Sequence, residues 1–196
     1  NDEKGSNPDK PSIGDLSVEE IGDKSKYHLR NSKTSWINDQ WVYDLVTPWI
    51  ENANKLAGWY FDIDWYESLQ FTKYHETGAF YGWHKDGGGD WHDIYKKEIP
   101  GVTPSNSKDQ KFVRYINQVG KVRKLSATIT LNDEYTGGNL KFDLGPHVNQ
   151  RYYECKEIKS PGSIVVFPSF VDHCVTPIKS GVRYSLVCWA LGRPFR

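Results

Sequence analysis

The chain has 196 residues, of which 37% are hydrophobic and 14% aromatic, a composition that suits one folded domain with its own core and excludes a disordered protein. Its 25 basic residues balance 25 acidic ones, so net charge gives no support for a protein that binds nucleic acid through a large positive surface. Three cysteines without CxxC spacing support neither a disulfide framework nor a zinc ribbon, and no apolar run reaches the roughly 18 residues of a membrane span.

The N-terminal part is predicted to be a flexible lead-in followed by a helical support. Residues 1–14 are polar and rich in Pro, Gly and Asp, which is typical of an unpacked segment. In residues 41–57 apolar side chains recur at spacings of three and four, and Gly58 follows as a stop signal. Pro48 should either kink this helix or begin a second helical segment. We therefore expect helical support over residues 15–58.

From residue 59 onward the pattern changes to short runs with a period of two, typical of strands. In one run, Ala127 and Ile129 alternate with Thr128 and Thr130, as expected for a sheet with one face on a core and the other on a pocket. Several short strands punctuated by Gly and Pro indicate a sandwich, barrel or jelly roll. The predicted strands are residues 65–74, 125–131, 138–142, 163–167 and 184–190.

A long stretch of weak periodicity interrupts the strands from residue 87 to about 115. Loops of this length within a compact domain are commonly lids or binding loops, so we expect a lid here. We expect one domain over residues 1–196, with the β core over 59–196. A group of basic residues near the end of the lid is interpreted as solvated surface: Lys108, Lys111, Arg114, Lys121, Arg123 and Lys124.

His84 and Asp86 are two residues apart, so on an extended strand both side chains point to the same side and can bind one cation. Such a pair alone is weak evidence, because it often arises by chance. His173, after the strand-like run SIVVFPSF, completes two histidines and one carboxylate. This set leaves three open positions on an octahedral ion, as in non-haem iron oxygenases, whereas a structural zinc site needs four ligands. The alternative for His173 is an ordinary core or surface histidine.

A buried cation is predicted ten residues after His173. Arg183, Ser185 and Trp189 would share one face of a predicted strand. A guanidinium group suits the distal carboxylate of 2-oxoglutarate through two charge-assisted hydrogen bonds, and a serine hydroxyl adds a donor. Thr128, on the predicted pocket face, is a further candidate for binding this co-substrate. A surface position for the arginine is the alternative.

Together these motifs resemble the prolyl 4-hydroxylase-type branch of the Fe(II)/2-oxoglutarate dioxygenases. The resemblance covers residues 69–196 and rests on YHETGAFYGWHKD, RKLSATITLNDEYTGGNLKF, PGSIVVFP and RYSLVCW. It implies a mainly β fold with flanking helices (α+β). The implied core is a double-stranded β-helix of the jelly-roll, cupin-like type, packed against the N-terminal helical segment.

The resemblance also implies roles for single residues. Tyr74, ten residues before the first histidine, would donate a hydroxyl group to the co-substrate. Trp189 matches an aromatic residue of the family's pocket, although a core position is an equal alternative. The separation of the carboxylate from the second histidine is longer than the family pattern. The implied iron ligands are His84, Asp86 and His173, and the implied carboxylate anchor is Arg183.

The implied reaction is hydroxylation of a C–H bond by Fe(II) and O2, with conversion of 2-oxoglutarate to succinate and CO2 and with ascorbate as a candidate reductant. A prolyl residue in a peptide or protein is the first substrate hypothesis. A free amino acid or other small molecule is the second, and a catalytically inactive binding module is the third. Candidate substrate contacts are Trp91, His92, Tyr95 and Trp189. We expect a cytoplasmic protein with reduced thiols and no membrane or nucleic-acid partner, and leave its oligomeric state open.

Overall fold

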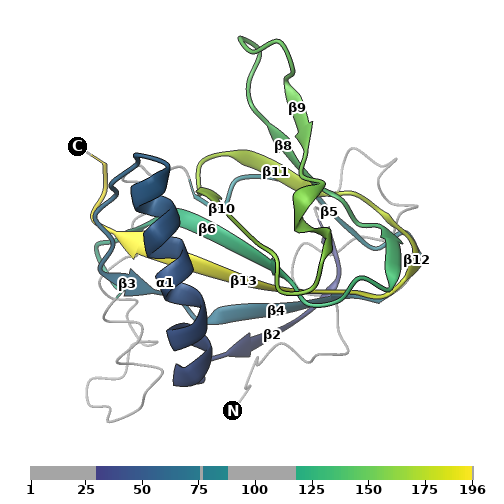
Figure 1. Ribbon diagram of the computed structural model, residues 1–196, viewed down its shortest axis with the longest axis horizontal. Coiled ribbons are helices and arrows are strands. Elements are labelled where there is room, and N and C mark those ends of the chain that lie inside the picture. The colour runs from purple at the N-terminus through teal and green to yellow at the C-terminus, as the bar shows by residue number, and fades with distance from the viewer. Residues whose placement is uncertain (1–29, 76, 88–117, 196) are drawn as a thin grey trace, which may run out of the picture.

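The computed structural model describes residues 30–75, 77–87 and 118–195. In this part of the chain two antiparallel sheets pack face to face, and a helix covers the outer face of the larger one (Figure 1). The larger sheet has the strand order β10-β6-β13-β4-β2, with β3 paired to β13. Its strands are β2 (Lys33–Ile37), β3 (Trp65–Tyr66), β4 (Leu69–Tyr74), β6 (Val122–Thr130), β10 (Ile164–Pro168) and β13 (Arg183–Gly192).

The second sheet has the order β1-β5-β11-β8-β9, and a separate ladder pairs β12 with β7. The hairpin of β8 and β9 projects from the body of the molecule (Figure 1). A short 3-10 helix, η3 (Glu157–Lys159), precedes β10. The strands are β1 (Arg30–Asn31), β5 (Phe80–His84), β7 (Tyr135–Gly137), β8 (Leu140–Asp143), β9 (Tyr152–Glu154), β11 (Asp172–Val175) and β12 (Ile178–Gly181).

This two-sheet architecture confirms the predicted mainly β, jelly-roll fold with a supporting helix. Strands were correctly predicted within or across residues 65–74, 125–131, 138–142, 163–167 and 184–190. The shorter strands of the second sheet and of the β7–β12 ladder were mostly missed, because two to five residues are too few to display a period of two.

Two hydrophobic cores lie on either side of the larger sheet. The helix α1 (Gln40–Leu56) buries Val42, Val46 and Ile50 against the outer face. Alternate residues of β6 and β13 supply the other side of this core, among them Ala127 and Leu186. The second core lies between the two sheets and includes Tyr74, Leu140, Phe142, Phe167 and Val175. The predicted alternation along β6 is therefore present, with its polar residues turned toward the inter-sheet space.

Pro48 does not divide the helix, which is continuous from Gln40 to Leu56. The prediction of a second segment starting there is wrong, because packed residues on both sides of the proline, Val46 and Ile50, hold both turns against the sheet. The Thr47 hydroxyl donates to the carbonyl of Tyr43 at 2.9 Å in the turn before the proline.

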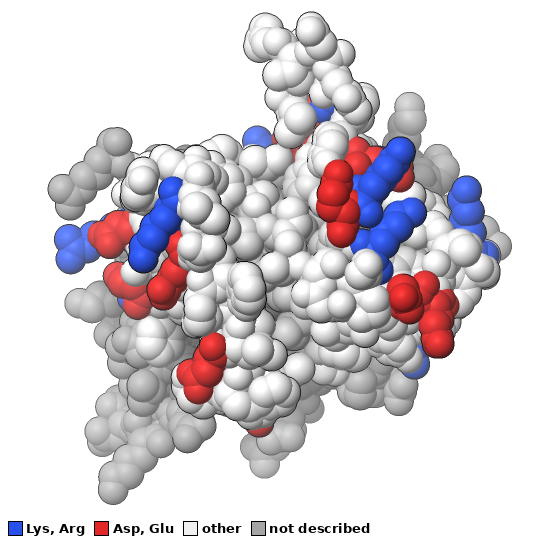
Figure 2. Space-filling model, in the orientation of Figure 1, with Lys and Arg blue, Asp and Glu red and all other residues white. Residues whose placement is uncertain are grey.

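The outer side of α1 carries large apolar side chains that remain exposed. Trp41, Leu45, Trp49 and Leu56 are each at least 60% exposed. Figure 2, which views the molecule from the side of α1, shows charged residues in small mixed groups around a broad uncharged area. No helix in the described part of the chain has both the length and the apolar character that a membrane crossing requires.

The prediction of helical support over residues 15–58 is wrong for residues 30–37, which form β1 and β2. The buried side chains of this segment are polar: Arg30, Ser32 and Thr34 are 8%, 1% and 6% exposed. A period of two made of buried polar residues leaves no hydrophobic pattern, which explains the error. Residues 15–29 and the predicted lead-in over residues 1–14 lie outside the described residues.

Candidate metal and co-substrate site

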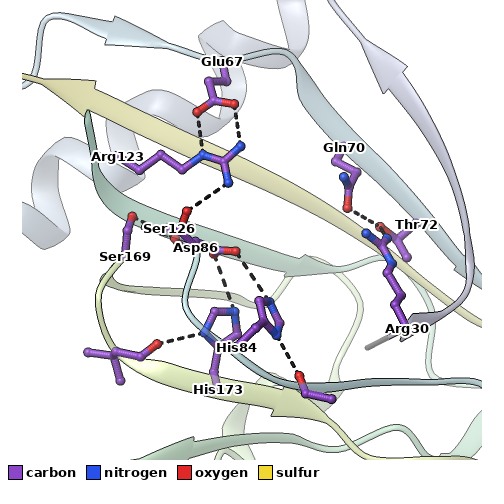
Figure 3. Close-up of polar contacts among 12 residues, drawn as sticks. Arg30, Glu67, Gln70, Thr72, His84, Asp86, Arg123, Ser126, Ser169 and His173 are labelled. Carbon is purple, nitrogen blue, oxygen red and sulfur yellow. Dashed lines mark hydrogen bonds and ion pairs between the residues drawn. The ribbon is translucent and has the colours of Figure 1, made fainter. Parts of the chain in front are cut away.

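Two neighbouring strands bring the predicted triad together. His84 ends β5, and His173 lies in β11 as its register partner in the antiparallel pair. Asp86 follows β5 and places one carboxylate oxygen 3.6 Å from His84 Nε2 and the other 3.5 Å from His173 Nε2 (Figure 3). One ligand atom of each residue lies within 4.8 Å of the others, so a single ion could contact all three.

Backbone carbonyls orient both imidazoles. His84 Nδ1 lies 2.8 Å from the carbonyl of Gly82, and His173 Nδ1 lies 3.0 Å from that of Val171. Because a carbonyl only accepts, each Nδ1 must donate, which leaves the lone pair of a neutral ring on Nε2. In both rings Nε2 is the nitrogen next to Asp86, and such a backbone hydrogen bond is the usual way to orient a metal-binding histidine.

The electrostatics of the triad also suit a divalent cation. Burial opposes ionisation of Asp86, but at the acidic pH where the carboxyl titrates the protonated His84 and His173, together with Arg123, outweigh burial and hold the carboxyl pKa below its usual range. Burial lowers the pKa of His173, which favours the neutral, ligating form. Two imidazoles and one carboxylate form the donor set of a facial iron triad with open positions, so these residues fit Fe(II).

A second layer of polar contacts fixes the backbone at Asp86. Its amide and that of Gly87 donate to the carbonyl of Ser169 at 3.0 and 3.1 Å. Arg123 donates from Nη1 to the Asp86 carbonyl at 3.1 Å and binds Glu67 through two hydrogen bonds of 2.6 and 2.7 Å (Figure 3). Its guanidinium also lies 4.0 Å from the ring centroid of Trp189. Arg123 thus connects the segment that carries Asp86, a candidate metal ligand, to the larger sheet.

The interpretation of the basic cluster as solvated surface is therefore wrong for its described members. Arg123 belongs to the network above, Lys124 is 4% exposed with its amine against the Phe195 ring, and Lys121 pairs with Asp64 at 2.9 Å. These residues lie in or next to β6, and their partners Asp64, Glu67 and Phe195 are distant in the sequence. The spacing of lysines and arginines along the chain cannot reveal such contacts. The other members, Lys108, Lys111 and Arg114, lie outside the described residues.

Arg183, at the start of β13, is 2% exposed. Its Nη1 donates to Ser185 Oγ at 3.1 Å, and its guanidinium lies 5.2 Å from the ring centroid of Tyr74. Its Nε is buried without an acceptor among the described residues, which also supply no carboxylate in an ion pair with it. A buried guanidinium is costly unless an anion balances it. This orphaned donor fits the distal carboxylate of 2-oxoglutarate.

One cavity connects the triad to Arg183. The strand face of Arg183, Ser185, Val187 and Trp189 forms one wall, as the period of two predicts. Trp189 is 5% exposed, and its indole Nε1 is a buried donor without an acceptor among the described residues. Predicted residues that line this cavity are Tyr74, His84, Asp86, Thr128, His173, Arg183, Ser185 and Trp189. Trp91, His92 and Tyr95, and the predicted lid beyond Gly87, lie outside the described residues.

Two further residues of the cavity were missed from the sequence. The Tyr81 ring stacks on His84 with centroids 3.6 Å apart, and the guanidinium of Arg30 lies 4.7 Å from the Tyr81 centroid. On a regular strand, positions 81 and 84 would face opposite sides. The register shifts between the two pairs that β5 makes with β11, so three residues of β5 span two of β11. This bulge turns Tyr81 and His84 to the same side.

Comparisons with known proteins identify the family and the fold. A family model described as the 2OG-Fe(II) oxygenase superfamily matches residues 69–191. A PKHD-type hydroxylase from Synechococcus sp. (strain CC9605) is 43% identical over 70 residues, which cover 34% of this chain and 29% of that protein. A PKHD-type hydroxylase from Synechococcus sp. (strain CC9902) is 44% identical over 70 residues, covering 34% and 28%. The chain thus aligns with less than a third of the length of these curated relatives.

Solved structures share the fold at low sequence identity. A Pseudomonas putida prolyl-4-hydroxylase matches with a TM-score of 0.53 and 21% identity, over 86% of this chain and 74% of that one. A prolyl hydroxylase from Trichoplax adhaerens, solved with a peptide fragment of a hypoxia inducible factor oxygen degradation domain, matches with a TM-score of 0.54 and 18% identity, over 83% and 63%. At such identities the likeness establishes the fold alone.

Proposed function

The chain belongs to the 2OG-Fe(II) oxygenase superfamily, and on this premise we propose that it is an Fe(II)- and 2-oxoglutarate-dependent dioxygenase that hydroxylates a C–H bond. The observation that carries the proposal is the shared cavity. It joins three candidate ligands within 4.8 Å of one another to a buried arginine whose Nε has no acceptor among the described residues. A 2-oxo acid with a distal carboxylate can reach from one to the other.

The chain's own residues would bind, orient and shield the reactants. Iron held by His84, Asp86 and His173 supplies the oxidising chemistry, in which O2 and 2-oxoglutarate yield succinate, CO2 and hydroxylated substrate. Arg183 donates two hydrogen bonds to the distal carboxylate of 2-oxoglutarate, and Ser185 orients the guanidinium. Burial of this cavity excludes water and so strengthens each of these electrostatic contacts.

Tyr74 and Thr128 complete the proposed co-substrate site. The Tyr74 ring lies under the Arg183 guanidinium, which restricts the position of that cation, and its hydroxyl group is a second donor to the distal carboxylate. Thr128 lines the same cavity from β6. Ascorbate is the proposed reductant for iron that becomes oxidised without a completed turnover.

The first proposed substrate is a prolyl residue of a peptide or protein. The names of the curated relatives and of the structural neighbours support a hydroxylase of this type, and one neighbour was solved with a peptide fragment. Trp189 lies on the cavity wall, and its indole donor has no acceptor among the described residues, so it is the proposed substrate contact in this part of the chain. Trp91, His92 and Tyr95 stay predictions. A free amino acid or other small molecule is the second candidate, favoured by the buried Arg30 considered below.

A pair of aspartates tests the proposed activity. Asp86→Asn keeps the size of a metal ligand and removes its charge, whereas Asp172→Asn does the same at a half-exposed carboxylate of β11. Protein loaded anaerobically with Fe(II) is assayed for O2-dependent succinate release, with proline-containing peptides and free amino acids as substrates. Mass spectrometry detects a gained oxygen.

We expect Asp86→Asn to lose Fe(II)-dependent succinate release and Asp172→Asn to retain it. Equal activity of the two variants would remove Asp86 from the proposed site. A wild-type protein that binds Fe(II) but never consumes 2-oxoglutarate would contradict the proposed reaction and support the inactive binding module instead.

A further inference from the structure

We propose that Arg30 binds a carboxylate group of the substrate, so that the preferred substrates are small carboxylic acids or peptides with a carboxylate next to the hydroxylated residue. This inference rests on the proposed function, because it concerns the same cavity. Arg30 lies in β1, at the edge of the second sheet, and its side chain lines the cavity with the triad and Arg183.

Arg30 is held by two hydrogen bonds, but no carboxylate of the described residues balances its charge. It is 8% exposed, its Nη2 donates to Thr72 Oγ1 at 3.1 Å, and its Nε donates to Ser32 Oγ. Both partners are neutral hydroxyls, and the remaining hydrogen bond of this group joins Thr72 to the neutral side chain of Gln70 at 3.3 Å (Figure 3). None of the described aspartates or glutamates forms an ion pair with Arg30.

Among the charges of the described residues and of the bound iron and co-substrate, the positive charge of Arg30 has no counterpart. Without Arg30, the charges of Fe(II), the Asp86 carboxylate, Arg183 and doubly charged 2-oxoglutarate cancel. The charged side chains that the described residues contribute to the cavity are Arg30, Asp86 and Arg183, so one positive charge remains after the co-substrate has bound. A buried unpaired cation destabilises a protein, and a monoanionic ligand would neutralise it. A carboxylate carries one charge and matches the planar guanidinium fork, whereas a phosphate would add a second charge.

The position of Arg30 indicates the substrate side of the site. Its guanidinium lies over the Tyr81 ring, and Tyr81 in turn stacks on His84. Arg30 and the Tyr81 ring therefore lie between a bound anion and His84, a candidate iron ligand. That separation suits a compact acid whose reacting carbon is close to its carboxylate. Arg183 contacts Tyr74 and Ser185 instead, so each arginine has its own set of neighbours.

The test compares acids with their amides on four proteins: wild type, Arg30→Gln, Arg30→Lys and Arg193→Gln. Arg193 is exposed, so Arg193→Gln removes the same charge at the surface and is the matched control. The probes are L-proline with L-prolinamide, and acetyl-alanyl-proline with its C-terminal amide. Anaerobic calorimetry on protein loaded with Mn(II) and 2-oxoglutarate measures binding without turnover.

We expect wild type and Arg193→Gln to bind at least one acid more tightly than its amide. Arg30→Gln should lose this preference by roughly 10- to 100-fold, as for a hydrogen bond to a charged group, and Arg30→Lys should retain part of it. The two probe pairs distinguish a free amino acid from the C-terminus of a peptide. Equal binding of acids and amides by wild type, including no binding of either, would overturn the inference.

A parallel titration of 2-oxoglutarate distinguishes the remaining alternative. If Arg30→Gln weakens the binding of 2-oxoglutarate as much as the binding of the acid probe, Arg30 binds the co-substrate and the inference is wrong. Succinate release by wild type reports the proposed reaction separately. A protein that prefers the acids but releases no succinate would contradict the proposed reaction while leaving carboxylate binding by Arg30 supported.

Discussion

Arg183 and Arg30 are both buried cations, and their hydrogen-bond partners among the described residues are hydroxyl groups. Truncation of either arginine removes a charge that no described carboxylate balances, so its principal effect should be on ligand binding rather than on folding. The same residues therefore allow ligand binding to be tested one charge at a time, provided that each variant is compared with an exposed arginine such as Arg193.

Arg183→Ala should weaken 2-oxoglutarate binding without removing the metal site. Loss of the buried partner of a carboxylate costs about 3 kcal/mol or more, which corresponds to at least about a hundredfold in affinity. Calorimetry with Mn(II) and with 2-oxoglutarate measures the two steps separately, and Arg193→Ala is the control. Unchanged affinity for 2-oxoglutarate would show that Arg183 does not anchor it.

The thiols should be unreactive in the native protein. All three cysteines of the chain are buried and free, and burial raises the pKa of Cys155 and raises that of Cys188 to about 12. A raised pKa leaves little thiolate at pH 8, and thiolate is the reactive form. Iodoacetamide should label Cys188 at least about a hundredfold more slowly in the native protein than in urea-unfolded protein. Mass spectrometry of digests measures this, and rapid native labelling would contradict the described burial.

At the scale of elements, the turn between β12 and β13 determines where Arg183 begins its strand. Gly181 has a φ of +77°, and an added Cβ would lie 2.3 Å from the carbonyl oxygen of Glu134 and 2.9 Å from Tyr135 Cα. Both are backbone atoms, which cannot rotate away as a side chain does. The register of Gly181 opposite Tyr135 in the β7 ladder therefore requires glycine here.

Gly181→Ala should consequently lower the free energy of unfolding by more than the strain of a positive φ alone explains. Gly162 has a similar φ of +83° but no atom within 4 Å of an added Cβ, so Gly162→Ala measures the conformational strain, about 1–2 kcal/mol. The clash should add about 1–3 kcal/mol in Gly181→Ala. Urea unfolding measures both, and equal losses of stability would show that the turn relaxes without penalty.

At the scale of the whole molecule, α1 supports the sheet that carries Arg183, Ser185 and Trp189. Their strand neighbours Leu186 and Cys188 face the helix core, so the helix and the cavity occupy opposite faces of β13. Packing on one face therefore keeps the strand in place for binding on the other.

Ile50→Ala should lower the free energy of unfolding by about 2–5 kcal/mol, since Ile50 is fully buried between helix and sheet. Leu45→Ala, on the same helix at 62% exposure, should change it by less than about 0.5 kcal/mol. Chemical unfolding of both variants measures the difference. Similar losses at the two positions would mean that the exposed side of α1 is also packed in solution.

The sequence by itself determined what depends on spacing within one element. The single residue between His84 and Asp86, the alternation of Arg183, Ser185 and Trp189, and the alternating faces of β6 all follow from side-chain directions along a strand. The jelly-roll class followed from several such strands and from the family resemblance. These features needed no knowledge of which strands pair.

Only the tertiary structure decided which distant groups meet. Register between β5 and β11 places His173 beside His84, and a bulge in the same pair turns Tyr81 to that side. Arg123 reaches Asp86 and Glu67, and Arg30 enters the cavity from a strand whose buried residues are polar. Hydrophobic periodicity reports the burial of apolar residues but not of polar ones, and spacing along the chain does not specify a cross-strand partner. For that reason the candidate ligands were predictable from the sequence, while the residues that position them and the Arg30 cation of the cavity were not.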